Sequence, residues 1–200
     1  MGDRRGHAPA ADRNKGPILE VLKRCLPAHG LIVEIASGTG QHVAHFAKAL
    51  PGLTWQPTEL DADRHDSIAA WIEFEKLGNV RPPLLLDVGE HPWPVDNADA
   101  VICSNMVHIS PWQTTVDLMK GSARLLRGGG IVFLYGPFRR YGAHTAPSNE
   151  VFDADLRARN PEWGVRDLEA VTEVASANGF EFGEAVAMPA NNFSVIFRKR

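Results

Sequence analysis

Apolar residues along the chain gather in short continuous runs, separated by longer stretches in which they recur at helical spacing. The runs predict strands at 31–36, 53–57, 83–87, 99–104 and 131–136. The stretches between them predict helices near 41–50, 63–77 and 112–126, after an earlier helix from Ile18 to Leu26. Alternation of helices with continuously apolar strands is typical of a parallel sheet covered on both faces.

This alternation stops after Gly136-Pro137. Residues 138–163 form a long segment rich in polar and aromatic residues, and we expect it to be an irregular lid or substrate loop. A helix near 167–178 follows, and the apolar runs 180–188 and 193–197 predict an antiparallel hairpin. The expected fold is α/β: a doubly wound, Rossmann-like, mostly parallel seven-stranded sheet with a C-terminal antiparallel hairpin.

Composition narrows the class of protein. With 44% apolar residues, a chain of 200 residues can bury one core, so we expect a single domain over 1–200 with a loose N-terminal arm at 1–12. The net charge of −3 predicts neither nucleic acid nor an anionic membrane as a partner. Cys25 and Cys103 form no metal or disulfide motif. No apolar run approaches the roughly 18 residues of a membrane span, and the sequence shows no apolar signal core. We therefore expect a cytoplasmic protein.

The most informative local pattern is a glycine turn that directly follows the first apolar run. A dinucleotide site requires Gly-x-Gly-x-x-Gly, but Ala36, Gly38 and Gln41 occupy those three positions. The missing third glycine disfavours a nucleotide-dependent oxidoreductase. With Glu34 two residues ahead of Ala36, the turn instead fits the acid-x-Ala/Gly-x-Gly-x-Gly loop that binds S-adenosylmethionine. A tight strand–helix connection without a ligand is the simpler alternative.

Two further acids follow later strands. Glu59 stands 21 residues after Gly38, where a carboxylate can accept both ribose hydroxyls, and Asp87 can accept from an adenine amino group. Each acid alone is also explained as a helix cap or an exposed turn residue. Three acids at successive strand ends favour S-adenosylmethionine as the ligand, with S-adenosylhomocysteine as the product.

Several longer motifs resemble one known family over nearly the whole chain. The motifs are Arg13-Asn14-Lys15, Glu34 to His42, Asn105 to Trp112, Tyr135 to Phe138, Trp163 to Glu169 and Met188 to Asn192. The chain resembles the short class I methyltransferases of domain-of-unknown-function family 938, related to methyltransferase-like protein 26. Similar sequences usually carry aspartate where this chain has Glu59. The resemblance implies an S-adenosylmethionine-dependent methyltransferase fold and says little about the acceptor.

Candidate site residues follow from these patterns and from the resemblance. Those expected to bind the cofactor are Arg13, Asn14, Glu34, Ala36, Ser37, Gly38, Gly40, His42, Glu59, Asp87, Val88, Asn105 and Met106. Because the resemblance includes Arg13 to Lys15, we expect this segment to fold over the cofactor site. His108, three residues after Asn105, is the candidate general base or acceptor-orienting group, and Tyr135 is a second catalytic candidate. A packed structural histidine and a tyrosine that caps the sheet are the alternatives.

Substrate choice is expected in the later segments. The candidates are Tyr141, Arg157, Trp163, Asn191 and Asn192. Arg157 or Arg159 could clamp an acidic acceptor. The alternative is that residues 153–159 form a surface helix with an Asp155–Arg159 ion pair. Asn191 and Asn192 are also explained by a turn.

The expected function is therefore methylation of a small molecule at a heteroatom. The alternative is a binding protein that holds S-adenosylmethionine as a partner or sensor. No metal motif is present in the sequence, and a homodimer remains an open alternative to a monomer.

Overall fold

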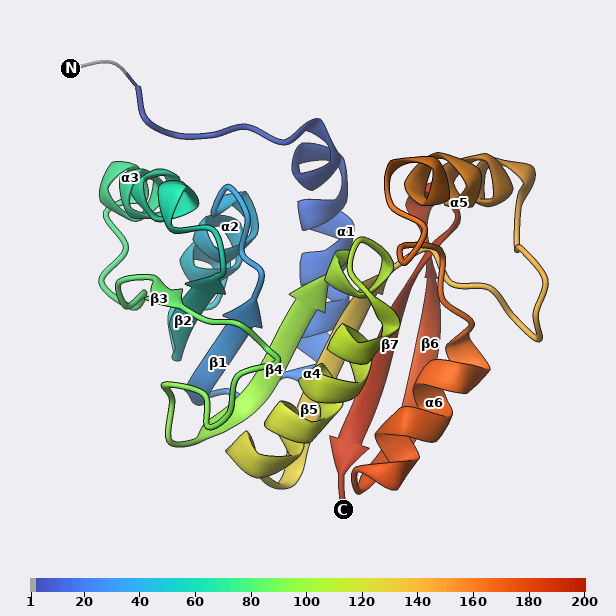
Figure 1. Cartoon of the computed structure of the whole chain (residues 1–200). Coiled ribbons are helices and arrows are strands. Elements are labelled where there is room, and N and C mark those ends of the chain that lie inside the picture. Colours follow the sequence, from blue (N-terminus) through green and yellow to red (C-terminus); the bar gives the residue numbers. More distant parts are fainter. Residues whose placement is uncertain (1–2) are drawn as a thin grey trace.

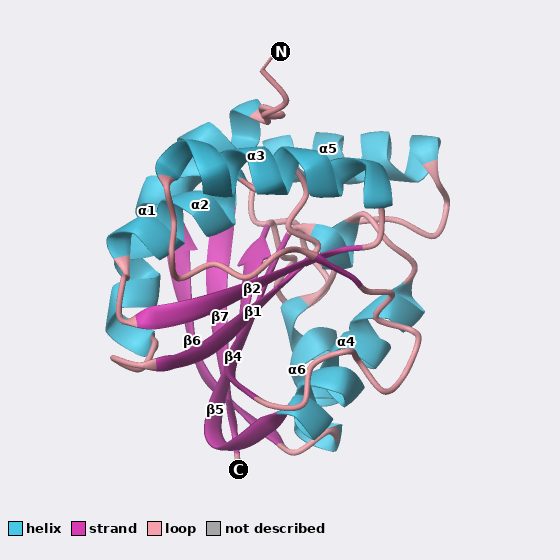
Figure 2. Cartoon of the chain, turned by 90° about the vertical axis from the view of Figure 1, so that its left-hand side faces the viewer, coloured by secondary structure: helices cyan, strands magenta, loops and turns pink. Residues whose placement is uncertain are grey.

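The computed structural model describes residues 3–200, which form one mixed sheet with helices on both faces (Figures 1 and 2). The strands are β1 (Gly30–Ile35), β2 (Leu53–Glu59), β3 (Leu84–Leu85), β4 (Ala98–Ser104), β5 (Leu126–Gly136), β6 (Phe180–Met188) and β7 (Asn192–Lys199). The α-helices are α1 (Pro9–Cys25), α2 (Gln41–Ala49), α3 (His65–Glu75), α4 (Trp112–Leu125), α5 (Pro147–Arg159) and α6 (Leu168–Ala177). Three short 3₁₀ helices are η1 (Ala62–Arg64), η2 (Met106–His108) and η3 (Pro189–Asn191).

The strands of the described residues are ordered β3-β2-β1-β4-β5-β7-β6. Strands β1 to β5 run parallel, whereas β7 runs antiparallel to both β5 and β6. The sequence prediction of a doubly wound sheet with a C-terminal antiparallel hairpin is confirmed. Because the chain builds outward from β1 to β3 and then returns to place β4 on the other side of β1, the strand order reverses between β1 and β4. Ligands of open α/β sheets bind at such a switch point, outside the carboxyl ends of the strands.

Alternating residues of each strand serve the two faces. In β1, Ile32 packs with Trp55 and Phe46 toward α1, α2 and α3, while Val33 and Ile35 pack toward α4 and α6. These β-branched side chains suit a strand that is buried on both sides. Among residues 3–200, none of the helices has the length and apolar character needed to cross a membrane.

Helix α5 lies apart from these two layers, above β6 and β7, on the edge of the sheet toward which β1 and β4 point (Figure 1). It occupies 13 residues of the segment 138–163, which we expected to be irregular. The structure therefore replaces half of the expected loop with a helix. The Asp155–Arg159 ion pair proposed as the simpler alternative is present, with a distance of 2.9 Å between Arg159 Nη2 and Asp155 Oδ2.

The start of the chain also differs from the expectation of a loose arm at 1–12. Helix α1 begins at Pro9, and residues 3–8 are held against α3, while residues 1 and 2 lie outside the described structure. The amide of Gly6 donates to Ser67 Oγ at 2.7 Å, and the indole of Trp71 donates to the carbonyl of Gly6 at 3.0 Å. Helix α1 was predicted too short because its first turns carry no apolar stripe.

Candidate functional site

A cavity of about 740 Å³ opens at the carboxyl ends of β1, β2 and β4. Its size is within the usual range of small-molecule sites. It is lined by Ala8, Ala10, Ala11, Asn14, Ile35, Ala36, Ser37, Gly38, Thr39, His42, Glu59, Leu60, Asp61, Arg64, Leu86, Asp87, Val88, Ser104, Asn105, Met106, Ile109, Ser110, Pro111, Thr114 and Trp163. The cavity therefore lies at the switch point of the sheet, where the fold predicts a ligand.

The glycine turn contributes to the cavity wall, and its two glycines have different roles. At Gly40 φ is +87°, and a Cβ atom would lie 2.8 Å from the backbone Cα of Ile68, so α2 and α3 approach each other only because this residue is glycine. At Gly38 φ is +57°, but the nearest neighbour of a Cβ atom would be Arg64 Nη1 at 3.7 Å. The Gly38 backbone is thus open to the cavity, whereas Gly40 serves packing.

Glu59 connects the end of β2 to this turn. Its Oε2 atom accepts from the amide of Gly38 at 2.7 Å, and its Oε1 atom accepts from the amide of Asp61 at 3.2 Å. The side chain is buried and lines the cavity. A carboxylate has about four acceptor positions, so Glu59 is fixed by the backbone and retains capacity for a ligand.

Glu34 is buried in β1, immediately before the residues that line the cavity, and does not line it itself. Its Oε2 atom has no hydrogen-bond partner among residues 3–200. Burial, with a smaller contribution from the nearby Glu59 charge, raises the pKa of this carboxyl to about 8, and a hydrogen bond with Ser37 opposes the rise. The Oγ atom of Ser104, which does line the cavity, is likewise buried without a partner in the described chain. Two polar groups beside the cavity are therefore left to be satisfied by a ligand or water.

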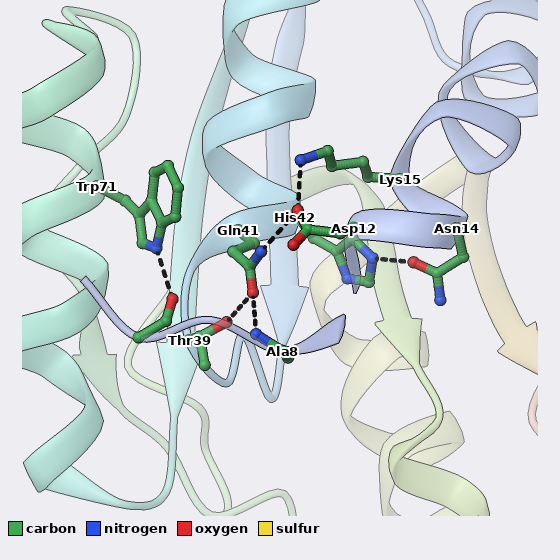
Figure 3. Close-up of polar contacts among 9 residues, drawn as sticks. Ala8, Asp12, Asn14, Lys15, Thr39, Gln41, His42 and Trp71 are labelled. Atoms are coloured by element: carbon green, nitrogen blue, oxygen red, sulfur yellow. Dashed lines mark hydrogen bonds and ion pairs between the residues drawn. The ribbon is translucent and has the colours of Figure 1, made fainter. Parts of the chain in front are cut away.

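The first turns of α1 lie beside α2 (Figure 3), and Ala10, Ala11 and Asn14 of α1 line the cavity. The Nε2 atom of His42 lies 2.7 Å from the Oδ1 atom of Asn14. An amide oxygen only accepts, so Nε2 carries the proton and Nδ1 keeps its lone pair. Burial lowers the pKa of His42 to about 4, which keeps the imidazole neutral. Burial raises the pKa of the Tyr135 phenol, and a side-chain hydrogen bond with Asn14 opposes that rise.

A second network in Figure 3 ties the same helix to the glycine turn through Gln41. The Gln41 amide nitrogen donates to Asp12 Oδ1 at 3.0 Å, and its Oε1 atom accepts from the amide of Ala8 and from Thr39 Oγ1. Lys15 completes the network through a 2.7 Å ion pair with Asp12. Of the motif Arg13 to Lys15, only Asn14 lines the cavity. Ala10 and Ala11, in the first turn of α1 ahead of the motif, line it as well.

His108 does not line the cavity. Its ring is fully buried; Nδ1 accepts from the amide of Arg166 at 3.2 Å, and a Cβ atom on Gly136 would lie 2.4 Å from Nε2. Burial lowers the pKa of this imidazole to about 3. His108 is therefore a packed histidine, the alternative to a general base that the sequence left open. The η2 turn directs its ring into the protein interior and away from the cavity.

The other predicted site residues fall into two groups, those that line the cavity and those that do not. The cofactor candidates in the cavity wall are Asn14, Ala36, Ser37, Gly38, His42, Glu59, Asp87, Val88, Asn105 and Met106; Arg13, Glu34 and Gly40 lie outside the wall. Of the substrate candidates, Trp163 lines the cavity, and Tyr141, Arg157, Asn191 and Asn192 do not.

The structure gives reasons for these exclusions. Tyr141 is 81% exposed. The Arg157 guanidinium is paired with Asp153 at 3.0 Å. The carbonyl of Asn191 accepts from Asn149 at 2.9 Å, which fixes the hairpin to α5. Sequence reasoning missed Ile109, Ser110, Pro111 and Thr114, although three of them stand in the motif that begins at Asn105. Within residues 3–200, no group of three or more His, Cys, Asp or Glu side chains is placed to hold a metal ion.

Comparison with solved structures places this architecture in a known class. The chain superimposes on an O-methyltransferase family protein from Burkholderia thailandensis with a TM-score of 0.80 and 17% identity, covering 95% of this chain and 57% of that one. For human N-acetylserotonin methyltransferase in complex with SAM, the TM-score is 0.79 and the identity 15%, covering 95% of this chain and 52% of that one. For an O-methyltransferase family 2 protein from Planctomyces limnophilus in complex with apigenin, the TM-score is 0.79 and the identity 15%, covering 96% of this chain and 60% of that one.

These likenesses give the fold of class I methyltransferases, and this chain spans between about half and three fifths of the length of those proteins. The family itself follows from sequence. A family model described as "Protein of unknown function (DUF938)" matches residues 5–199, and the chain belongs to that family.

Proposed function

We propose that this protein is a methyltransferase that uses S-adenosylmethionine and methylates a heteroatom of a small molecule. The observation that carries the proposal is Glu59: a buried carboxylate at the end of β2, fixed by the Gly38 amide at 2.7 Å and still part of the cavity wall. This is the arrangement that a ribose requires at the switch point of an open sheet. The proposed location is the cytoplasm, in keeping with two free, buried cysteines.

The other wall residues fit the remaining parts of this ligand. Asp87 and Val88 follow β3 and would receive the adenine, while Gly38 leaves room for the ligand beside the backbone. Behind the wall, Glu34 has a buried carboxylate oxygen without a partner in the described residues, which an ammonium group of the ligand would satisfy. Because burial raises the pKa of Glu34 to about 8, a cationic ligand would also favour the ionised carboxylate.

The bound cofactor would supply the methyl group and leave as S-adenosylhomocysteine, while the proton of the acceptor N–H or O–H would pass to solvent. The protein would orient the acceptor and exclude water. His42 and Asn14 line the cavity, as His108 does not, and are two of the polar groups able to orient the acceptor. The neutral imidazole of His42 can accept a hydrogen bond through Nδ1 from an acceptor N–H or O–H.

Relatives by fold support a small-molecule acceptor. One is named for N-acetylserotonin and another was solved with apigenin, and both names refer to small molecules. The competing function is a protein that binds S-adenosylmethionine without turnover, as a sensor or partner.

Isothermal titration with S-adenosylmethionine, S-adenosylhomocysteine and NAD tests the ligand. We expect both adenosyl compounds to bind and NAD not to bind. Glu59→Gln should weaken adenosyl binding by about tenfold or more, because a ribose contact with a charged acceptor is lost. Glu150→Gln, an exposed position on α5, is the matched control. Binding of NAD alone would overturn the proposal.

A second experiment tests turnover. The protein is incubated with methyl-labelled S-adenosylmethionine and fractionated small-molecule extract, and labelled products are separated by chromatography. A labelled product that requires intact protein supports methyl transfer. Binding of the cofactor without any product would favour the sensor or partner function.

A further inference from the structure

We infer that the part of the cavity beyond β4 binds an uncharged, planar acceptor against Trp163. The inference rests on the proposed function, because it assigns the acceptor end of the same cavity.

The charges of the cavity wall are confined to one end. The charged lining residues all stand at the end of β2 or after β2 or β3: Glu59, Asp61, Arg64 and Asp87. Within the described chain, the wall contributed by α1, by the end of β4, by η2 and α4, and by Trp163 contains no Lys, Arg, Asp or Glu. Since β1 separates β2 from β4, the two ends lie about 10 Å apart across the sheet.

Nearby charges are directed elsewhere. Lys15 pairs with Asp12, and Arg157 pairs with Asp153. The Arg166 guanidinium is occupied by backbone carbonyls, and His42 is neutral because burial lowers its pKa to about 4. A carboxylate or phosphate placed at this end would lose its hydration without gaining an ionic partner among the residues of this part of the wall. The wall therefore favours an acceptor whose buried part is uncharged.

Trp163 is the flat surface at this end, and its position is set by its neighbours on both sides. The Trp163 amide donates to Asn160 at 3.0 Å, and the Gly164 amide donates to the carbonyl of His108 at 2.9 Å. At Gly164 φ is +155°, a backbone conformation that residues with a side chain rarely adopt, and a Cβ atom would lie 2.7 Å from Asp153 Oδ1, so this position favours glycine. The backbone that carries the indole is thus fixed beside η2.

Arg166 acts as a positioning residue for the same wall. Its Nε donates to the carbonyl of Val107 at 2.9 Å, and its Nη2 donates to the carbonyls of Glu162 and Ser110. These bonds join the segment that carries Trp163 to the loop that carries Ile109. We call this set of bonds the Arg166 latch. A preorganised ring loses little entropy on binding, and aromatic rings stack face to face with an offset or edge to face.

The test uses three bicyclic probes of similar size on the protein saturated with S-adenosylhomocysteine. The probes are 2-naphthol, which is planar and uncharged, 2-naphthoate, which is planar and anionic, and decahydro-2-naphthol, which is uncharged but not planar. Titration calorimetry or saturation-transfer NMR measures their affinities. We expect 2-naphthol to bind about tenfold or more tightly than either of the others.

Variants assign the binding to Trp163. Trp163→Ala should weaken 2-naphthol by about tenfold while S-adenosylhomocysteine affinity stays unchanged, and Trp163→Phe should restore most of the affinity. Phe152→Ala, at an exposed position outside the cavity wall, is the control. If Trp163→Ala does not fold, the inference is tested by 2-naphthol binding to Trp163→Phe and by the three probes on the unmodified protein.

Equal binding of 2-naphthoate, or 2-naphthol binding that is unaffected by Trp163→Ala, would overturn the inference. Failure of S-adenosylhomocysteine to bind would overturn the proposed function instead. In that case the same probes on the protein alone still test the Trp163 surface.

Discussion

The Nε2 atom of His42 and the Oδ1 atom of Asn14 lie 2.7 Å apart, which joins the first turns of α2 and α1 beside the cavity. Burial lowers the pKa of His42 to about 4. Asn14→Asp would place a carboxylate at this contact and should raise the pKa of His42 by about one to three pH units, since an opposite charge favours the imidazolium. NMR titration of the ring protons measures it. Gly16→Asp, on the same helix at a position with open space, is the control, and an equal shift in both variants would contradict the contact.

Glu34 predicts a dependence of stability on pH. Its pKa is raised from an ordinary value of 4.5 to about 8, so between these values the folded state binds more protons than the unfolded state. Stability from this group is present below pH 4.5 and is lost as the pH rises toward about 8. Glu34→Gln should therefore be more stable than the unmodified protein at pH 9, by about 3–5 kcal/mol.

Urea unfolding of both proteins without added cofactor, at pH 5 and pH 9, checks this prediction. Their difference in free energy of unfolding should be small at pH 5 and large at pH 9. Equal pH slopes would show that Glu34 titrates normally in the folded protein.

Gly38 and Gly40 should respond differently to alanine. Gly40→Ala should cost about 2–4 kcal/mol, because the left-handed backbone disfavours a side chain and the Cβ atom would meet the Ile68 backbone at 2.8 Å. Gly38→Ala should cost only the backbone term, about 1–2 kcal/mol. Its methyl group would enter the cavity, so it should weaken S-adenosylhomocysteine binding at least as strongly as Gly40→Ala does. Thermal unfolding and calorimetry separate the two effects, and the reverse order of stabilities would refute the assignment.

His108 is predicted to stabilise the fold instead of contacting substrate. His108→Leu removes the acceptor of the Arg166 amide and should cost about 2–4 kcal/mol, whereas His108→Asn keeps an acceptor near the Nδ1 position and should cost less. The pKa of His108 is lowered from 6.5 to about 3, so its contribution is lost as the pH falls through that window, and both variants should flatten this acid slope. A folded His108→Asn protein without turnover would instead make the histidine catalytic.

The sheet was predictable because its signal is local: continuous apolar runs such as Ile131 to Leu134 leave few alternatives to a buried strand. The acids at strand ends were predictable for the same reason, and Glu59 and Asp87 both reach the cavity wall. The direction of His108 was not, because it depends on a turn that starts at Asn105 with φ of +63°. Whether a side chain after such a turn faces a cavity or a core is decided by segments far away in sequence, here Arg166.

The Arg166 latch is made to main-chain oxygens of Val107, Ser110 and Glu162, and not to their side chains. Every residue type provides a main-chain carbonyl, so mutations at these three positions can change the surface without removing the bonds. Proteins of this kind could thus diverge toward new acceptors through single substitutions near Ile109 while the frame that holds the indole is inherited intact.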